Sequence, residues 1–153
     1  SILPNLVVPG IAEAVAASPA IKVYVCNVMT QPGETTGYVA SDHVRAILEH
    51  AREGAVDYVL VNVQPVPADL LQRYAAEGAH PVKVDRARVR ALGPQVVEGD
   101  LLYCRGYVRH DAAKLAAAIL RLALRDRRFS RGLSLFELYA LRERLRDHAS
   151  GTR

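Results

Sequence analysis

Residues 22–38 read KVYVCNVMTQPGETTGY, and this stretch decides the fold class of the chain. An apolar run ends at Asn27 and is followed by a polar loop that contains Pro32 and Gly33. The apolar residues of a helical pattern begin soon after Ser41. Open α/β sheets build ligand sites from a strand, a loop and a helix in this order, at the carboxyl edge of the sheet. The stretch therefore predicts a strand, a ligand-binding loop and a helix.

Strand and helix patterns alternate along the rest of the chain. Residues 21–28 and 56–63 are apolar on both faces, which is typical of strands buried in a parallel sheet. Further strands are predicted at 82–84, 95–99 and 101–107, and helices from Pro9, from Ser41 or Asp42, from Pro67, from Arg86 and after the capping residue Asp111. This alternation predicts an α/β fold, a Rossmann-like three-layer domain with a mainly parallel sheet.

The distribution of charge divides the chain after residue 124. The formal net charge is +4, and residues 125–153 carry all of the excess, with eight arginines among four acidic residues. An arginine-rich tail can contact nucleic acid, acidic lipid or a partner. Because acidic residues are interleaved and no aromatic base-stacking pattern accompanies them, a solvated helix is favoured, with a capping box at Ser134–Glu137. We therefore expect an α/β domain over 1–124, a basic helical tail over 125–153, and no nucleic-acid partner.

Other classes of protein are excluded by composition. No apolar run reaches the roughly 18 residues that a membrane-spanning helix needs, so no transmembrane segment is expected. The two cysteines, Cys26 and Cys104, lie in apparent strands and are expected to be buried, reduced thiols, which suits the cytoplasm. The histidines and cysteines show no metal-ligand spacing, and no nucleophile motif is present. The sequence therefore indicates a binding site and no catalytic or metal site.

The loop after the first strand carries most of the candidate ligand-binding residues. Its amides and threonine hydroxyls can donate hydrogen bonds to phosphate, its glycines allow close backbone approach, and the helix after it adds a favourable dipole. An anionic ligand is therefore expected. The alternative is a plain polar connection in which Pro-Gly forms a turn. The candidate residues are Asn27, Thr30, Gln31, Gly33, Glu34 and Thr35.

Candidates outside this loop are Asn62 and Arg109. Asn62 stands near the end of the second strand as Asn27 does near the end of the first, and the alternative role is a hydrogen bond between neighbouring loops. Arg109 follows the predicted strand 101–107, and its guanidinium can bind a diphosphate bidentately. The alternative for Arg109 is an exposed surface charge. Asp42 and His43 are adjacent on a helix and cannot form an acid–base dyad with each other, so Asp42 is expected to be a cap.

The segments NVMTQPGET (27–35) and GYVASDHV (37–44) resemble the CofD-like family. Further similarity lies in ILPNLVVPGI (2–11), in Val61-Asn62 and in YVRHD (107–111), so that the resemblance extends from residue 1 to about 124. It is stronger to the gluconeogenesis-factor branch than to the 2-phospholactate transferase branch. Family members carry a glycine-rich loop upstream of these segments. The resemblance therefore implies that this chain is the C-terminal half of a larger fold and that the missing N-terminal half completes the ligand site.

The resemblance also implies a function. The first expectation is a cytoplasmic regulatory protein of carbon metabolism and cell-shape maintenance that binds a UDP-sugar such as UDP-N-acetylglucosamine, without a certain cofactor. The alternative is a transferase that moves a phospholactyl group from a nucleotide-diphosphate donor to a deazaflavin, and a divalent cation is expected only in that case. A homodimer is compatible with either function.

Overall fold

The computed structural model describes residues 2–51, 53–126 and 134–150. The predicted tail is therefore described in part, and Arg127, Arg128, Arg131 and Arg153 lie outside the described residues. The helices are α1 (Leu3–Leu6), α2 (Ile11–Ala17), α3 (Ala40–His50), α4 (Ala68–Ala76), α5 (Arg86–Ala91), α6 (Ala112–Arg125) and α8 (Leu135–Ser150). The strands are β1 (Val23–Val25), β2 (Tyr58–Asn62), β3 (Gln95–Gly99), β4 (Leu102–Cys104) and β5 (Val108–His110).

Three parallel strands form the central sheet, in the order β1-β2-β3. The register pairs Tyr24 with Val59 and Val59 with Val96. The middle strand is the most deeply buried, because Val59, Leu60 and Val61 are at most 1% exposed. The α/β class and the parallel sheet predicted from the two apolar runs are thus confirmed.

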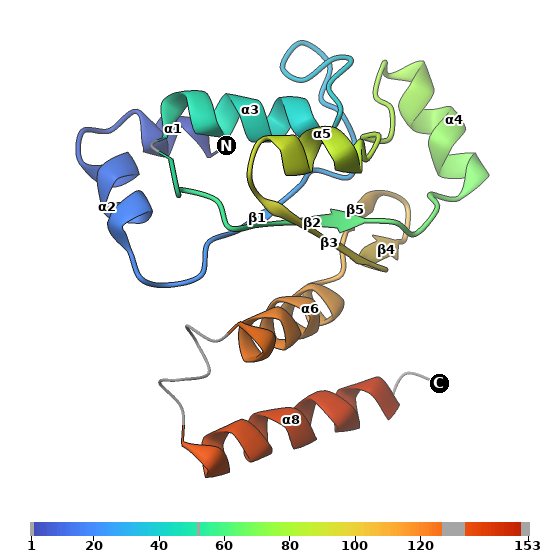
Figure 1. The fold of residues 1–153 in the computed structure, drawn as a ribbon. Helices are drawn as coiled ribbons and strands as arrows, with labels where there is room; N and C mark the ends of the chain where they lie inside the picture. Colours follow the sequence, from blue (N-terminus) through green and yellow to red (C-terminus); the bar gives the residue numbers. More distant parts are fainter. Residues whose placement is uncertain (1, 52, 127–133, 151–153) are drawn as a thin grey trace.

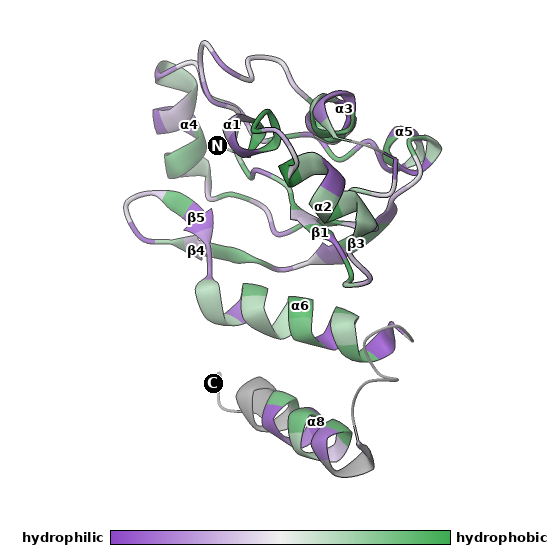
Figure 2. Cartoon of the chain, turned by 90° about the vertical axis from the view of Figure 1, so that its left-hand side faces the viewer, coloured by the Kyte–Doolittle hydropathy of each residue, from purple (hydrophilic) through white to green (hydrophobic). Residues whose placement is uncertain are grey.

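Helices cover both faces of the sheet (Figure 1). Helices α1, α3 and α5 lie on one face, and α6 crosses the other. Figure 2 shows the same order of layers from the side, with α6 between the strands and α8. Val44 and Ile47 of α3 and Val89 of α5 belong to the core cluster on the first face, together with Val59 and Val61. No helix in the described ranges combines the length and the apolar character needed to cross a bilayer.

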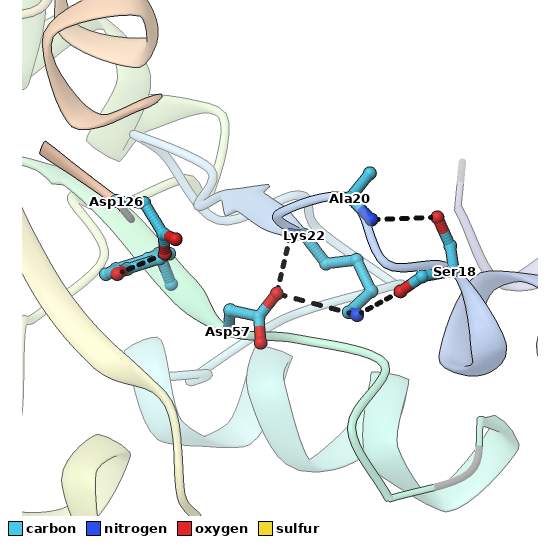
Figure 3. Close-up of polar contacts among 6 residues, drawn as sticks. Ser18, Ala20, Lys22, Asp57 and Asp126 are labelled. Atoms are coloured by element: carbon cyan, nitrogen blue, oxygen red, sulfur yellow. Dashed lines mark hydrogen bonds and ion pairs between the residues drawn. The ribbon is translucent and has the colours of Figure 1, made fainter. Parts of the chain in front are cut away.

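Side chains at the amino edge of the sheet fix the start of the strands (Figure 3). The carboxylate of Asp57 accepts a hydrogen bond of 2.7 Å from the Lys22 backbone amide, and the Lys22 ammonium lies 3.6 Å from the same oxygen. The Tyr58 hydroxyl donates to Asp126, which is buried after the end of α6, at 2.9 Å. These contacts connect β1, β2 and α6 on the side of the sheet away from the predicted ligand loop.

Several predicted boundaries are corrected by the structure. Helix α3 begins at Ala40 with Val39 as its N-cap, and Asp42 accepts a hydrogen bond from the Val39 amide at 3.0 Å. Asp42 therefore stabilises the helix start from its third position and is not the cap. Residues 82–84 are not a strand, because Pro81 makes only an isolated bridge to Met29. The helix predicted from Pro9 begins at Ile11, with Gly10 as its N-cap at a φ of +89°.

The predicted single strand over 101–107 is wrong, because the chain reverses within it. β4 and β5 form an antiparallel hairpin, with Gly106 at a φ of +70° between them. Arg109 lies in β5, opposite Tyr103, and does not follow a parallel strand. The hairpin nevertheless begins directly after β3, so it extends from the carboxyl edge of the sheet.

Capping of the last two helices agrees with the sequence. Asp111 is the N-cap of α6, and its carboxylate accepts hydrogen bonds from the amides of Ala113 at 2.9 Å and Lys114 at 3.0 Å. Ser134 and Glu137 form the predicted capping box of α8, since the Ser134 amide donates to Glu137 and the Glu137 amide donates to Ser134. Cys26 and Cys104 are free thiols, and Cys26 is buried as expected, whereas Cys104 is only partly buried.

Replacing the Asp111 cap tests the start of α6. Asp111→Ala removes the acceptor of two amides that have no partner within the helix, and we expect the free energy of unfolding to fall by about 1 kcal/mol. Urea denaturation measures this change. Asp111→Asn is the control, because its side-chain oxygen can cap the same amides and should cost only about a few tenths of a kcal/mol. Equal stability of the alanine and asparagine variants would contradict the role of the cap.

Candidate ligand-binding site at the carboxyl edge of the sheet

A pocket of about 280 Å³ lies where β1 and β2 end. Ligand sites of open α/β sheets form at this edge, where the loops that leave neighbouring strands separate. Two of the predicted residues, Asn27 and Asn62, line the pocket. The other lining residues are Cys26, Val28, Val61, Val63, Gln64, Pro65, Val66, Leu71, Pro81, Val82 and Val84.

The two asparagines differ in what their side chains already bind. The Asn62 amide donates to the Gln64 carbonyl at 2.8 Å, and its side-chain oxygen accepts from the amides of Gln64 and Leu101. Asn62 therefore holds the loop after β2 against the segment after β3, which was the alternative role considered for it. The Asn27 side chain makes no hydrogen bond within the described ranges 2–51, 53–126 and 134–150. Its amide is thus available to a ligand in the pocket.

The loop 30–37 is ordered by its own hydrogen bonds. Thr30 is buried and exchanges two hydrogen bonds with the His80 backbone: its amide donates to the carbonyl at 2.7 Å, and its hydroxyl accepts from the amide at 2.9 Å. The Thr35 hydroxyl accepts from the Gln31 amide at 2.8 Å, and the Thr36 hydroxyl accepts from the Gly33 amide at 3.0 Å. The loop is therefore a preformed turn held against the segment before Pro81.

These bonds change what the loop can offer a ligand. The amides of Glu34 and Thr35 donate to the Gln31 carbonyl, so every amide donor from residue 30 to 35 has a partner inside the protein. In this structure these amides are therefore not free to donate to a phosphate. Within the described part of the chain, the amides of Thr36 and Gly37 are outside this set, and the exposed side chains of Gln31 and Glu34 point to no partner. None of the residues from 30 to 37 lines the pocket.

The N-terminus of α3 is occupied by a carboxylate. Asp85 accepts a hydrogen bond from the Ser41 amide at 2.9 Å and another from the Ser41 hydroxyl at 2.5 Å. The Ala40 amide donates to the Lys83 carbonyl at 2.9 Å. A helix N-terminus attracts one anion through its free amides and its dipole, and Asp85 already fills that position. In this structure the dipole of α3 therefore acts first on the carboxylate of Asp85.

Asp42 and His43 form no dyad, as expected from their spacing. The Asp42 carboxylate contacts the Val39 amide and the Arg45 guanidinium, which lies 3.2 Å away. The His43 ring is buried against Tyr38, with ring centroids 5.2 Å apart. Its Nε2 has no hydrogen-bond partner among the described residues, and burial lowers the pKa of His43. Burial lowers the pKa of His110 in the same way.

The buried His43 and the partly buried His110 predict how stability depends on pH. Their pKa values are lower in the folded than in the unfolded chain, so the unfolded chain binds more protons below the ordinary value of about 6.5. The stability is complete above that pH, and we expect the urea midpoint to fall as the pH drops from about 7.5 to 5.5. His43→Phe keeps a packed ring but cannot be protonated, so its midpoint should fall less over this interval. A midpoint that rises towards pH 5.5 would contradict the account.

The thiol at the pocket is not a nucleophile. Burial is the main cause that raises the pKa of Cys26 to about 12, so the group stays protonated at neutral pH. Burial also raises the pKa of the neighbouring Tyr24. No group of three or more His, Cys, Asp or Glu residues that could hold a metal ion occurs among the described residues.

Arg109 is held between two aromatic rings on the hairpin. Its guanidinium carbon lies 4.9 Å from the ring centroid of Tyr103 and 4.8 Å from that of Tyr107. Arg109 does not line the pocket. Gln64 connects the two regions, because its side-chain oxygen accepts a hydrogen bond from the Leu102 amide at the start of the hairpin.

The family model described as 2-phospho-L-lactate transferase CofD matches residues 1–102. The chain belongs to the CofD family. The residues of the pocket and of the preformed loop therefore lie within the part of the chain that the CofD model covers.

Two curated proteins and one solved structure are similar to this chain. It is 45% identical over 123 residues to the gluconeogenesis factor of Bacillus subtilis, covering 80% of this chain and 39% of the relative. It is 49% identical over 121 residues to the gluconeogenesis factor of Halalkalibacterium halodurans, covering 78% and 38%. A crystal structure of a UPF0052 family member from Bacillus halodurans superposes with a TM-score of 0.76 at 48% identity, covering 78% of this chain and 39% of that one. The chain thus spans about two fifths of the length of these relatives.

Several residues of this CofD-family pocket were missed by reasoning from the sequence. Gln64, Pro65 and Val66 follow β2, and Leu71 reaches the pocket from α4. The position of Gln64 two residues after Asn62 could have indicated it, because segments that follow parallel strands meet at the carboxyl edge. Leu71 carries no such signal, since the apolar face of a helix is the same whether it lines a core or a pocket.

Proposed function

We propose that this chain forms part of a nucleotide-sugar-binding regulatory protein of the gluconeogenesis-factor type. Its ligand in this proposal is a UDP-sugar such as UDP-N-acetylglucosamine, bound at the pocket beyond β1 and β2. The observation that carries the proposal is the pocket at the carboxyl edge of the sheet. One of its lining residues is Asn27, whose side-chain amide has no hydrogen-bond partner among the described residues. The names of the similar proteins from Bacillus subtilis and Halalkalibacterium halodurans support the regulatory class. The proposal includes a cytoplasmic role in carbon metabolism and cell-shape maintenance.

Arg109 is the proposed contact for the diphosphate. The guanidinium carbon lies over both the Tyr103 and the Tyr107 ring, and the N–H donors of the group lie in its plane. The stacked arginine can therefore bind phosphate oxygens bidentately while the rings keep it in place. The amides of Thr36 and Gly37 and the side chains of Gln31, Glu34 and Thr35 are the proposed contacts from the loop. We assign the remaining contacts to the part of the longer relatives that this chain does not cover.

Calorimetric titration of the full-length protein tests this proposal. UDP-N-acetylglucosamine should bind at one saturable site, and UDP alone should bind more weakly because it lacks the sugar contacts. The complex should also unfold at a higher temperature, since a ligand at one hundred times its Kd adds about 2.7 kcal/mol of stability. Absence of both heat and thermal stabilisation with any UDP-sugar would reject the proposal. Light scattering with and without ligand tests the homodimer.

The second candidate is a transferase related to the 2-phospholactate transferases, and the description of the family model favours it. Such an enzyme would transfer a phospholactyl group from a nucleotide-diphosphate donor to a deazaflavin with the help of a divalent cation. Incubation of the full-length protein with donor, deazaflavin and Mg²⁺ would then yield the phospholactyl deazaflavin. We expect no product, because the regulatory proposal requires binding alone. Formation of the product would replace the regulatory proposal by this one.

A further inference from the structure

The pocket differs from the rest of the site because none of its described lining residues is charged. Apolar side chains such as Val63, Pro65, Leu71 and Pro81 form most of its wall. Moving a charged phosphate from water into such surroundings without a partner charge is strongly unfavourable. Two groups of amides close in sequence to the pocket could otherwise bind an anion, but both already have partners. The N-terminus of α3 is paired with Asp85, and the amides from residue 30 to 35 donate to partners within the protein. An uncharged part of the ligand is therefore the group that fits this pocket.

The size of the pocket suits a part of the ligand. Pockets that enclose whole drug-sized ligands have volumes of about 300–1,000 Å³. At about 280 Å³, this pocket is smaller than that range and suits the base of a nucleotide sugar rather than the whole molecule.

The polar groups of the pocket are amides. The Asn27 side chain offers one donor group and one acceptor side by side. Gln64 uses its side-chain oxygen for the Leu102 amide, which leaves its NH₂ group as a further donor. The edge of a pyrimidine-dione ring presents a carbonyl, an N–H and a second carbonyl. A carboxamide pairs with this edge through two hydrogen bonds.

We propose that this pocket binds the uracil ring of the nucleotide. The side-chain amide of Asn27 then forms two hydrogen bonds with the imide edge of the ring. The inference rests on the proposed function and adds which part of the ligand this chain recognises. A deazaflavin carries the same imide edge on a larger ring system, so the two ring systems are compared directly in the test. Base selection then belongs to the residues after β1 and β2, and phosphate binding belongs to the hairpin and to the rest of the protein.

Competition titrations with the full-length protein test the inference. The ligands are UDP-N-acetylglucosamine, uridine, inorganic pyrophosphate, CDP and a deazaflavin, and the variants are Asn27→Ala and Asn27→Asp. Because the side chain of Asn27 makes no hydrogen bond with a described residue, both variants should keep the melting temperature of the wild type within a few degrees. Gln72→Ala is the matched control, since Gln72 is an exposed amide on α4 that does not line the pocket.

We expect Asn27→Ala to weaken uridine and UDP-N-acetylglucosamine about tenfold or more, because two hydrogen bonds are lost, and to leave pyrophosphate unchanged. Asn27→Asp offers only acceptors and should lower the preference for UDP over CDP by about tenfold. Wild-type affinity of Asn27→Ala for uridine, or an equal loss for pyrophosphate, would overturn the inference. If the wild type binds no UDP-sugar, the proposed function fails separately. In that case uridine that still binds the wild type and is weakened by Asn27→Ala would support the inference, whereas a pocket that binds the deazaflavin and not uridine would overturn it.

Discussion

Asp85→Ala should lower the free energy of unfolding of the full-length protein by about 2–5 kcal/mol. Ser41 is fully buried, and Asp85 is the acceptor for both its amide and its hydroxyl. Each hydrogen bond to a charged group contributes about 1.5–3 kcal/mol, and a buried donor left without a partner costs about 1–3 kcal/mol. The substitution also removes a negative charge from the N-terminus of α3. Urea denaturation of the variant and the wild type measures the difference.

Asp100→Ala is the control for Asp85→Ala. Asp100 is exposed in the short connection between β3 and β4, and it makes no hydrogen bond or ion pair within the described residues. Its removal should change stability by no more than about 0.5 kcal/mol. If the two alanine variants are equally stable, Asp85 does not hold the start of α3, and the helix terminus is open to an anionic ligand after all.

Arg109→Ala should weaken UDP-N-acetylglucosamine binding by about a hundredfold or more, with a much smaller effect on stability. The loss in affinity follows from removing charge-assisted hydrogen bonds to the diphosphate, each of which contributes about 1.5–3 kcal/mol. The stability change is limited to the two contacts with Tyr103 and Tyr107, at about 0.5–1 kcal/mol each for an exposed pair. Calorimetry measures the affinity, and thermal denaturation measures the stability.

Two further variants separate charge from geometry at this position. Arg105→Ala removes an exposed arginine from the turn of the same hairpin, where it stacks on no ring within the described residues, and it should bind UDP-sugar as the wild type does. Arg109→Lys keeps the charge but cannot bind bidentately or stack in the same way, so an intermediate affinity is expected. Wild-type affinity of Arg109→Ala would show that Arg109 is an ordinary surface charge.

The sequence predicted those features that depend on neighbouring residues. The run of apolar residues 56–63 indicated a strand buried on both faces, and β2 is the middle strand of the parallel sheet. Asp111 and the Ser134–Glu137 pair satisfy amides within three residues of themselves, so their spacing alone identified them as caps. Asn27 and Asn62 both line the pocket, as expected for residues near the carboxyl ends of two neighbouring parallel strands, which lie at the same edge of the sheet.

Features that depend on distant residues could not be predicted in this way. Asp85 reaches Ser41 across 44 positions of sequence, and no local pattern indicates that it closes the α3 terminus. From the sequence, the hydroxyls of Thr35 and Thr36 could equally well donate to a phosphate or accept from a loop amide. Only the folded turn shows that they accept from loop amides. The hairpin was missed because the strand-forming residues on both sides of Gly106 read as one strand.

Hydrogen exchange of the full-length protein, with and without saturating UDP-N-acetylglucosamine, tests the central claim most directly. The account predicts slower exchange of backbone amides at residues 26–28 and 61–66, which line the pocket, and unchanged exchange at the amino edge around Lys22 and Asp57. A saturated protein whose exchange at 26–28 and 61–66 equals that of the free protein would contradict the placement of the ligand at the carboxyl edge of β1 and β2.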